Sequence, residues 1–504
     1  MPSISSKSRK QALASVAMAA LAVSGLAFAG GLVPGSESAV SAQSGGNSIS
    51  AADKAQGAKA HPELLAEFGG AVSGAQANYV ERVGRTIAMQ SGLGNAREDF
   101  TVTLLDSPVN NAFAIPGGYV YVTRQLSALM NNEAELAGVL GHEVGHVAAR
   151  HSARRQSAAQ KNQLLGVLGS VLSNVLLGDS MLGQLGQRIA STGSQLLTLK
   201  YSRSQEQEAD RLGITYLQRA GYDPRAMATV LESLARQNAL DASLKGSSTQ
   251  VPEWASSHPD PASRVRDARK QAGSLTGRRE AETFLAGIDG LVYGDNPEQG
   301  VIENGRFVHP KLRFAFDAPE GFYMVNGTRA VTISGGSGKA QFSGGKLEGS
   351  LEAYISGVFS SLSESNSTSL RPSQIERVTV NGLPAAYGVV RTRSSSGEVD
   401  VAVFAYDFGN GQAYHFVTMT KAGGAGVFNP MFRSLTRIGA QEAGEVRPRV
   451  IDVVTVKSGD TPALLSQRMA FSNAQLERFL VLNGMREGDP LPAGRKVKIV
   501  RYGT

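Results

Sequence analysis

The sequence of 504 residues contains no cysteine. This absence excludes disulfide bonds, thiolate zinc sites, cysteine nucleophiles and the acceptor for bacterial lipid attachment. Any metal ion must therefore be bound by histidine, aspartate or glutamate side chains. The chain also has no large excess of charge of one sign, because the formal net charge is only +7. Residues 447–504 carry +5 of it. The middle of the chain is close to neutral, so we expect no nucleic-acid partner.

Long apolar runs are few, and one lies near the N-terminus. The uncharged run from Gln11 to Gly35 is rich in Ala, Leu and Val and follows three basic residues. This pattern predicts a secretory signal peptide over residues 1–42, followed by a flexible linker over 43–58. The alternative is a retained membrane anchor. In both cases the remainder is exported, and we expect it in the periplasm or cell envelope of a Gram-negative bacterium.

A second uncharged stretch, residues 162–178, carries an apolar helical stripe that is interrupted by glycines and polar residues. It is shorter than the ~20 apolar residues that span a membrane. A helix that packs on the domain core or forms a lid is therefore favoured over membrane contact.

The clearest chemical signal is a His-Glu-x-x-His pattern that begins at His142. Asn132 and Glu135 have the spacing of a helix N-terminus, so the pattern should lie on a helix. His142 and His146 then share one face and can bind a single Zn²⁺. Zinc lowers the pKa of its water to about 7, and Glu143 lies where a carboxylate can take the proton from that water.

A second helix is expected from the capping spacing of Ser202 and Gln205 to the stop signal at Gly221. A catalytic zinc usually keeps three protein ligands, and without cysteine a carboxylate is the natural third one. Glu206 and Asp210 share a face of this helix. One of the two can bind the metal while the other orients a ligand histidine.

Three motifs in order make the resemblance specific: Asn-Ala-Phe-Ala-Ile-Pro-Gly-Gly at 111–118, Glu-Ala-Glu-Leu at 133–136, and Ser-Arg-x-x-Glu-x-x-Ala-Asp at 202–210. The chain resembles the zinc metallopeptidase family that includes HtpX and the CAAX prenyl endopeptidases, in particular its secreted bacterial members. The resemblance implies that Glu206 is the third zinc ligand and that Asp210 contacts a ligand residue without binding the metal itself. It covers less than half of the chain.

Two further histidines lie near these motifs. His258, with its downstream Arg264, resembles the His-Pro and arginine pattern of the family. It can be a fourth ligand that blocks the water, a hydrogen-bond donor to the tetrahedral intermediate, or a loop residue. His151 lies five residues after His146, which on a continuous helix rotates it off the metal-facing side, so we expect a structural role. Glu208 is expected to be an acid on the helix surface.

The first motif also predicts how a substrate binds. Asn111, Ala112, Phe113 and Ala114 precede an alternating segment and should form a strand edge beside the active site. An exposed edge can pair with an extended peptide backbone. An ordinary hairpin turn is the alternative, and both can be true.

The rest of the chain predicts two attachments to a protease domain at 59–293. Short alternating strands and two helices suggest a small antiparallel α+β domain over 301–440, in which His309 and His415 are isolated. Residues 447–504 resemble a LysM module, the peptidoglycan-binding β-α-α-β unit. The matching segments are Val456–Thr461, Leu464–Leu465, Leu482–Gly484 and Leu491–Ile499. A packing role against the protease domain is the alternative to glycan binding.

Together these patterns predict an α+β protein with a mainly helical zincin-type domain and a small β-sheet edge. We expect a zinc metalloendopeptidase with one Zn²⁺ per chain that acts on protein or peptide substrates in envelope protein quality control. Two alternatives remain, an envelope assembly or chaperone factor and a peptidoglycan-tethered adaptor with little proteolysis.

Overall fold

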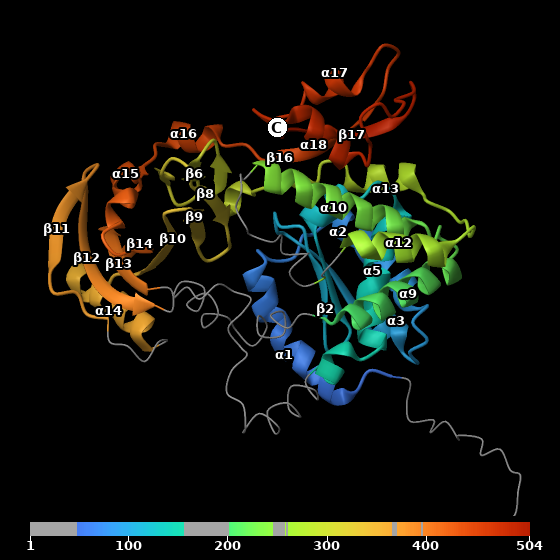
Figure 1. Cartoon of the computed structure of the whole chain (residues 1–504), viewed down its shortest axis with the longest axis horizontal. Helices are drawn as coiled ribbons and strands as arrows, with labels where there is room; N and C mark the ends of the chain where they lie inside the picture. Colours follow the sequence, from blue (N-terminus) through green and yellow to red (C-terminus); the bar gives the residue numbers. More distant parts are fainter. Residues whose placement is uncertain are drawn as a thin grey trace, which may run out of the picture. The chain divides into compact units, whose positions relative to one another are not determined.

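The computed structural model describes residues 48–155, 201–244, 258, 261–364, 370–394 and 397–503. These residues form a mixed fold of helices and β-sheets (Figure 1). The expected signal peptide at 1–42 and the uncharged stretch at 162–178 lie outside them. Among the described helices, none is both long and apolar enough to cross a bilayer.

The flexible linker expected over 43–58 is wrong from Ala51 onward, because helix α1 (Ala51–Glu67) begins there. Ser50 caps the helix by accepting a hydrogen bond from the Asp53 backbone nitrogen at 3.0 Å. Gly57 packs so closely that a Cβ atom would lie 2.1 Å from the Pro116 carbonyl oxygen. This buried contact accounts for order where the composition suggested a linker.

A three-stranded sheet lies at the centre of the first half of the chain. Its order is β1 (Thr101–Leu105), β3 (Tyr119–Thr123) and β2 (Ala112–Ile115), with β1 and β3 parallel and β2 antiparallel to β3. Strand β2 is therefore an edge strand, as expected from the sequence. Helix α2 (Ala75–Ala88) packs on β1, where Gly84 gives Val102 the space it needs.

Helix α5 (Glu133–Ala148) is buried over nearly its whole length and organises the domain. It packs on β2 and β3 on one side and on α9 (Arg203–Arg219) on another. Helix α10 (Ala226–Leu244) contacts α5 and lies beside α12 (Pro261–Ala272), as Figure 1 shows. The caps of α5 and α9 confirm the predicted helix starts, since Asn132 caps the first and Ser202 with Gln205 forms a capping box on the second. The other short helices here are α3 (Ala96–Asp99), α4 (Arg124–Leu129) and α13 (Ala281–Ile288).

The segment after α13 is fixed to the domain by hydrogen bonds. Arg124 donates to the Gly294 carbonyl at 2.6 Å, and the Asn296 amide donates to Asp106 at 2.8 Å. Within this segment lie strand β4 (Val292–Tyr293) and the turn η2 (Pro297–Gln299).

Residues 301–440 contain two antiparallel sheets with their own aromatic-rich core, as expected for an α+β unit. The seven-stranded sheet has the order β11 (Ile375–Val380), β12 (Leu383–Ser394), β13 (Gly397–Asp407), β14 (Gln412–Lys421), β10 (Gly338–Lys346), β9 (Val331–Gly335) and β8 (Tyr323–Asn326). The four-stranded sheet has the order β15 (Thr436–Arg437), β7 (Phe314–Asp317), β6 (Arg306–His309) and β5 (Val301–Glu303). The helical pieces are α14 (Leu351–Glu364), η3 (Ala425–Phe428), α15 (Asn429–Ser434) and α16 (Ala440–Glu445).

The C-terminal segment has the β-α-α-β order that the sequence predicted. It runs through β16 (Arg449–Thr455), α17 (Pro462–Ser466), α18 (Gln475–Leu482) and β17 (Lys496–Tyr502). Strand β16 pairs with β17 and also with β4, so a strand from the end of the first domain joins this small sheet. Its apolar side chains belong to the same hydrophobic core as those of α5 and α10. This module is therefore packed into the first domain.

Candidate metal centre

Two helices bring the expected ligands together because glycines let their backbones approach. A Cβ atom at Gly213 of α9 would lie 3.1 Å from the backbone nitrogen of His142, and one at Gly145 of α5 would lie 3.2 Å from the Ala209 carbonyl oxygen. This close approach places Glu206, in the first turn of α9, opposite the two histidines of α5.

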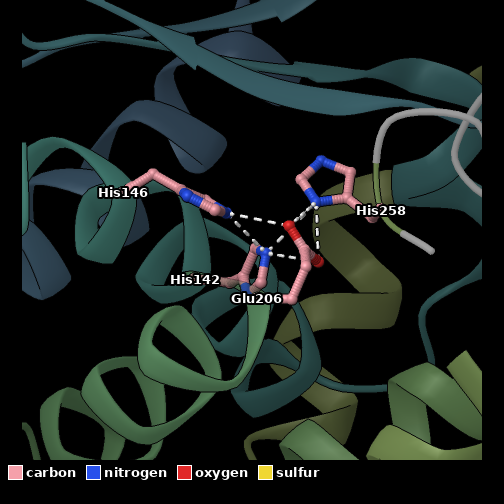
Figure 2. A group of neighbouring side chains, drawn as sticks. All are labelled: His142, His146, Glu206 and His258. Atoms are coloured by element: carbon pink, nitrogen blue, oxygen red, sulfur yellow. Dashed lines mark hydrogen bonds and ion pairs between the residues drawn. The ribbon is translucent and has the colours of Figure 1, made fainter. Parts of the chain in front are cut away.

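The side chains of His142, His146, Glu206 and His258 converge on one point (Figure 2). One possible ligand atom from each residue lies within 4.8 Å of all the others. The Nε2 atoms of His142 and His146 are 3.0 Å apart, and the carboxylate oxygens of Glu206 lie 3.6 and 3.4 Å from them. Nδ1 of His258 is 3.0 Å from Glu206 and 3.3 Å from His142 Nε2.

The donor set fits a zinc ion. All four residues are buried, with exposed fractions of 2% or less, and three imidazoles with one carboxylate are ligands that Zn²⁺ accepts. Burial lowers the pKa of His146 well below its usual value, so it is neutral and can donate a lone pair. Burial acts to raise the pKa of Glu206, but the surrounding histidines outweigh it and lower that pKa, which keeps the carboxylate ionised.

The pKa of His258 shifts in the opposite direction from that of His146. Burial acts to lower its pKa, but the carboxylates of Glu206 and Glu143 outweigh this and raise it. Positive charge is therefore favoured at this corner of the cluster, between two carboxylates. The structure thus places His258 at the site, while its role as a fourth ligand or as a gate stays a prediction.

Glu143 lies beside this cluster with the environment of a proton acceptor. It is fully buried, and within the described part of the chain neither carboxylate oxygen has a hydrogen-bond partner. The nearest cationic atom is Nε2 of His258, 3.6 Å away. Burial raises the pKa of Glu143, with partial opposition from His258 and His142. A carboxylate with a raised pKa is better matched to proton transfer near neutral pH.

Asp210 occupies the position expected behind His142. Its Oδ1 lies 2.9 Å from His142 Nδ1, on the side of the ring away from the cluster. Arg264 donates to both oxygens of Asp210, at 2.8 and 2.7 Å, and lies 2.6 Å from Glu206. Burial acts to raise the pKa of Asp210, but Arg264 and His142 outweigh it and lower the pKa. Asp210 therefore stays ionised.

The contacts of three residues at the site were not predicted from the sequence. Arg264 was noted only as part of a motif, yet its buried guanidinium neutralises two site carboxylates. The ring of Tyr201 stacks on His146 with centroids 3.7 Å apart, and Arg155 covers the Tyr201 ring at 4.0 Å. Arg264 lies 54 residues after Asp210 in the sequence. The only signal for its role was that two buried carboxylates need a cationic partner.

The prediction that His151 continues the His146 helix is wrong. Helix α5 ends at Ala148, and Arg150 adopts a left-handed conformation with φ 54° before His151 starts a new helical turn. The chain reversal brings His151 Nδ1 to 2.8 Å from His146 Nδ1. Glu208, expected on the surface, lies 3.1 Å from His151 Nε2.

The predicted substrate strand lies close to the site. Ala114 and Ile115 of β2 line a cavity of about 90 Å³ together with His146 and Tyr201. All four side chains of β2 are buried, as is Asn111 before it. Its edge position and the cavity that it shares with His146 agree with a strand beside the site, while substrate pairing along it stays a prediction.

Comparison with known proteins finds similarity in this part of the chain. Residues 74–272 match the model of peptidase family M48. The β-barrel assembly-enhancing protease of Yersinia pestis is 36% identical over 200 residues, which are 39% of this chain and 39% of that protein. The mitochondrial metalloendopeptidase OMA1 of Schizosaccharomyces pombe is 29% identical over 231 residues, which are 45% of this chain and 63% of that protein.

The family match ends at residue 272, before the two C-terminal units, and the match to the Yersinia protein spans only 39% of that protein. The likeness therefore concerns the metal-binding domain. The match contains His142, Glu143, His146, Glu206 and Asp210, whose arrangement is described above. Residues 74–272 are therefore similar to peptidase family M48, and the comparisons support the class of metalloendopeptidase for this chain.

Proposed function

We propose that this chain is a zinc-dependent endopeptidase of the bacterial envelope. The observation that carries the proposal is the buried cluster of His142, His146 and Glu206 with the carboxylate of Glu143 beside it, which accepts no hydrogen bond from the described residues. A buried carboxylate without hydrogen bonds costs free energy, so its presence calls for a functional reason. Proton transfer during peptide hydrolysis supplies that reason.

In this mechanism His142, His146 and Glu206 hold the metal, and Asp210 orients His142. A zinc ion bound there supplies Lewis acidity, which polarises the scissile carbonyl and acidifies water. Glu143 accepts a proton from the attacking water and passes it to the nitrogen of the leaving amine. The buried surroundings of Glu143 favour its neutral form, which assists the second of these transfers.

His258 gives the site two possible states. With His258 as a fourth ligand, the metal would be held by four protein side chains, as in structural zinc sites. The 3.0 Å distance from His258 Nδ1 to Glu206 supports this closed arrangement. With His258 withdrawn, a position opens for substrate chemistry. A residue that assists instead would donate a hydrogen bond to the tetrahedral intermediate, and the two roles predict opposite effects of its removal.

The proposed substrates are misfolded or misassembled envelope proteins. Support comes from the relatives named as β-barrel assembly-enhancing proteases and from the export signal predicted at 1–42. The C-terminal LysM-like module would add peptidoglycan contact through the loops after β16 and before β17, which are largely exposed. Its packing against the peptidase core equally supports a structural role.

The test is cleavage of casein by the purified mature protein, with zinc content measured on the same samples. We compare wild type with Glu143→Gln and His258→Ala. About one zinc per chain and loss of cleavage in Glu143→Gln would support the peptidase. Higher activity in His258→Ala would identify a gate, and lower activity would identify an assisting residue.

Other outcomes would favour the alternatives. Bound zinc without cleavage in wild type and in His258→Ala would favour a binding or assembly role, and so would a Glu143→Gln gene that complements a deletion strain. A wild-type protein that binds no zinc would reject the proposed site.

A further inference from the structure

The two histidines of α5 are supported from behind in different ways. His142 Nδ1 contacts the carboxylate of Asp210 directly at 2.9 Å. His146 Nδ1 instead contacts a second imidazole, that of His151, at 2.8 Å. The carboxylate of Glu208 follows on the far side of His151, at 3.1 Å from its Nε2. A carboxylate therefore contacts His142 directly, whereas the imidazole of His151 lies between His146 and its carboxylate.

The backbone explains why this contact exists. On a continuous helix, five residues advance the direction of a side chain by about 500°, so His151 would point about 140° away from His146. The left-handed φ of 54° at Arg150 ends the helix and changes the direction of the chain before His151. His151 then becomes fully buried beside His146, while Arg154 of the new turn donates to Glu208 at 2.9 Å.

Only one placement of the ring protons on His146 and His151 is compatible with metal binding by His146. Nε2 of His146 faces the cluster, so it must keep its lone pair for the metal. The single proton of neutral His146 is then on Nδ1 and is donated to Nδ1 of His151. His151 must therefore carry its own proton on Nε2, where Glu208 accepts it. The reverse orientation would place a proton on His146 Nε2 and block metal binding.

The position of Glu208 favours this tautomer of His151. Glu208 carries its negative charge at the far nitrogen, which selects the proton position on Nε2. Partner groups of this kind fix ring orientation and raise ligand basicity in metal sites.

We infer that His151 is a positioning residue for the metal ligand His146, and that Glu208 holds His151 in the tautomer that this task requires. The inference rests on the proposed function, because it takes the metal to bind at His142, His146 and Glu206.

The test measures zinc affinity by competition with a chromophoric chelator, using the full mature chain. His151→Leu removes the acceptor at Nδ1, whereas His151→Asn places an amide oxygen near the same point. We expect His151→Leu to weaken zinc affinity by about 10- to 100-fold and His151→Asn to restore most of it. Glu208→Ala should weaken affinity in the same direction. Gln207→Ala, an exposed neighbour on α9 that contacts Asp267 at 3.2 Å, is the matched control and should bind zinc like wild type.

Several results would overturn the inference. Equal losses in His151→Leu and His151→Asn would mean that the imidazole acts by packing alone. Unchanged affinity in His151→Leu and Glu208→Ala, with zinc-loaded and active wild type, would reject the inference but leave the proposed function intact. Wild type that binds no zinc and cleaves no casein would reject both. If His151→Leu fails to fold, Glu208→Ala decides, because that side chain is 33% exposed and its removal leaves the core unchanged.

Discussion

A Cβ atom built at Gly213 would lie 3.1 Å from the backbone nitrogen of His142. The two residues belong to α9 and α5, the helices that supply Glu206 and the two ligand histidines. Contacts between 3.0 and 3.4 Å are tighter than packed side chains normally make, so only glycine fits here without a shift of one helix. The close spacing of the two helices that carry the candidate ligands therefore depends on a glycine at position 213.

Gly213→Ala should reduce both stability and zinc affinity. The added methyl group forces the helices apart, and overpacking of this kind costs about 1–3 kcal/mol. The matched control is Gly138→Ala on α5, where the nearest atom would be 3.6 Å away. That variant should be neutral or more stable by up to about 1 kcal/mol, because alanine favours helix. Urea unfolding and zinc competition check this, and equal behaviour of the two variants would contradict it.

Arg264→Met should destabilise the fold strongly. The substitution leaves Glu206 and Asp210 buried without their guanidinium partner, and removal of one member of a buried charge group costs about 3–5 kcal/mol. We expect the loss of unfolding free energy to be larger without zinc than with it, since the metal also offsets the carboxylates. Urea unfolding in chelator and in zinc measures this difference.

The control lies on the same helix. Arg269 pairs with Glu232 at 2.5 Å, but its side chain is 57% exposed, and exposed ion pairs contribute about 0–1 kcal/mol. Arg269→Met should therefore change stability little. A loss as large as that of Arg264→Met would show that burial of the charges is not the cause.

The parts of the site that the sequence predicted are those set by local geometry. The four-residue spacing of His142 and His146 and the caps at Asn132 and Ser202 depend only on neighbouring residues along a helix. The resemblance then assigned Glu206 its place opposite them. These predictions agree with the structure because a helix converts sequence spacing into direction.

The parts that were missed depend on long-range contacts or on an uncommon backbone state. The left-handed conformation of Arg150, which no glycine or asparagine signalled, changed the direction of His151. Packing of the C-terminal module against the protease domain was one of the two roles considered from the sequence. Its strand partner was not foreseen, because the two-residue strand β4 pairs with β16 far along the chain. Ala51 begins a helix because α1 packs against the turn after β2, a contact that composition alone does not reveal.

Removal of zinc should lower the melting temperature of the wild-type protein. A metal that binds only the native state stabilises it by RT ln(1 + [L]/Kd), which is about 2.7 kcal/mol when free zinc is 100 times Kd. Glu206→Gln should melt at nearly the same temperature with and without zinc. Scanning calorimetry in zinc and in chelator measures both shifts, and a zinc effect of equal size in the variant would place the metal elsewhere.

Lys498 gives a pH-dependent test of the contact between the C-terminal module and the peptidase domain. This fully buried side chain of β17 donates to the carbonyl oxygens of Ala128, at 2.8 Å, and Met130. Burial lowers the pKa of Lys498 to about 7, although nearby Glu135 acts to raise it. The ordinary lysine pKa of 10.5 describes the unfolded chain. Between these values the unfolded state binds more protons than the native state, so this group makes stability rise with pH from about 7 to 10.5.

Lys498→Met removes this dependence and leaves a constant loss from the two carbonyl groups. The difference in unfolding free energy between wild type and variant should therefore grow as the pH is raised from 7 to 9.5, because only the wild type gains stability over that range. Urea unfolding at the two pH values measures the change, and the difference between proteins cancels the titration of other groups. Lys496→Met is the control, since Lys496 lies on the same strand, is 36% exposed and pairs with Glu282 at the surface. A pH-independent difference for Lys498→Met would mean that the lysine is hydrated in solution and that the module does not close on the carbonyl groups of Ala128 and Met130 at the end of α4.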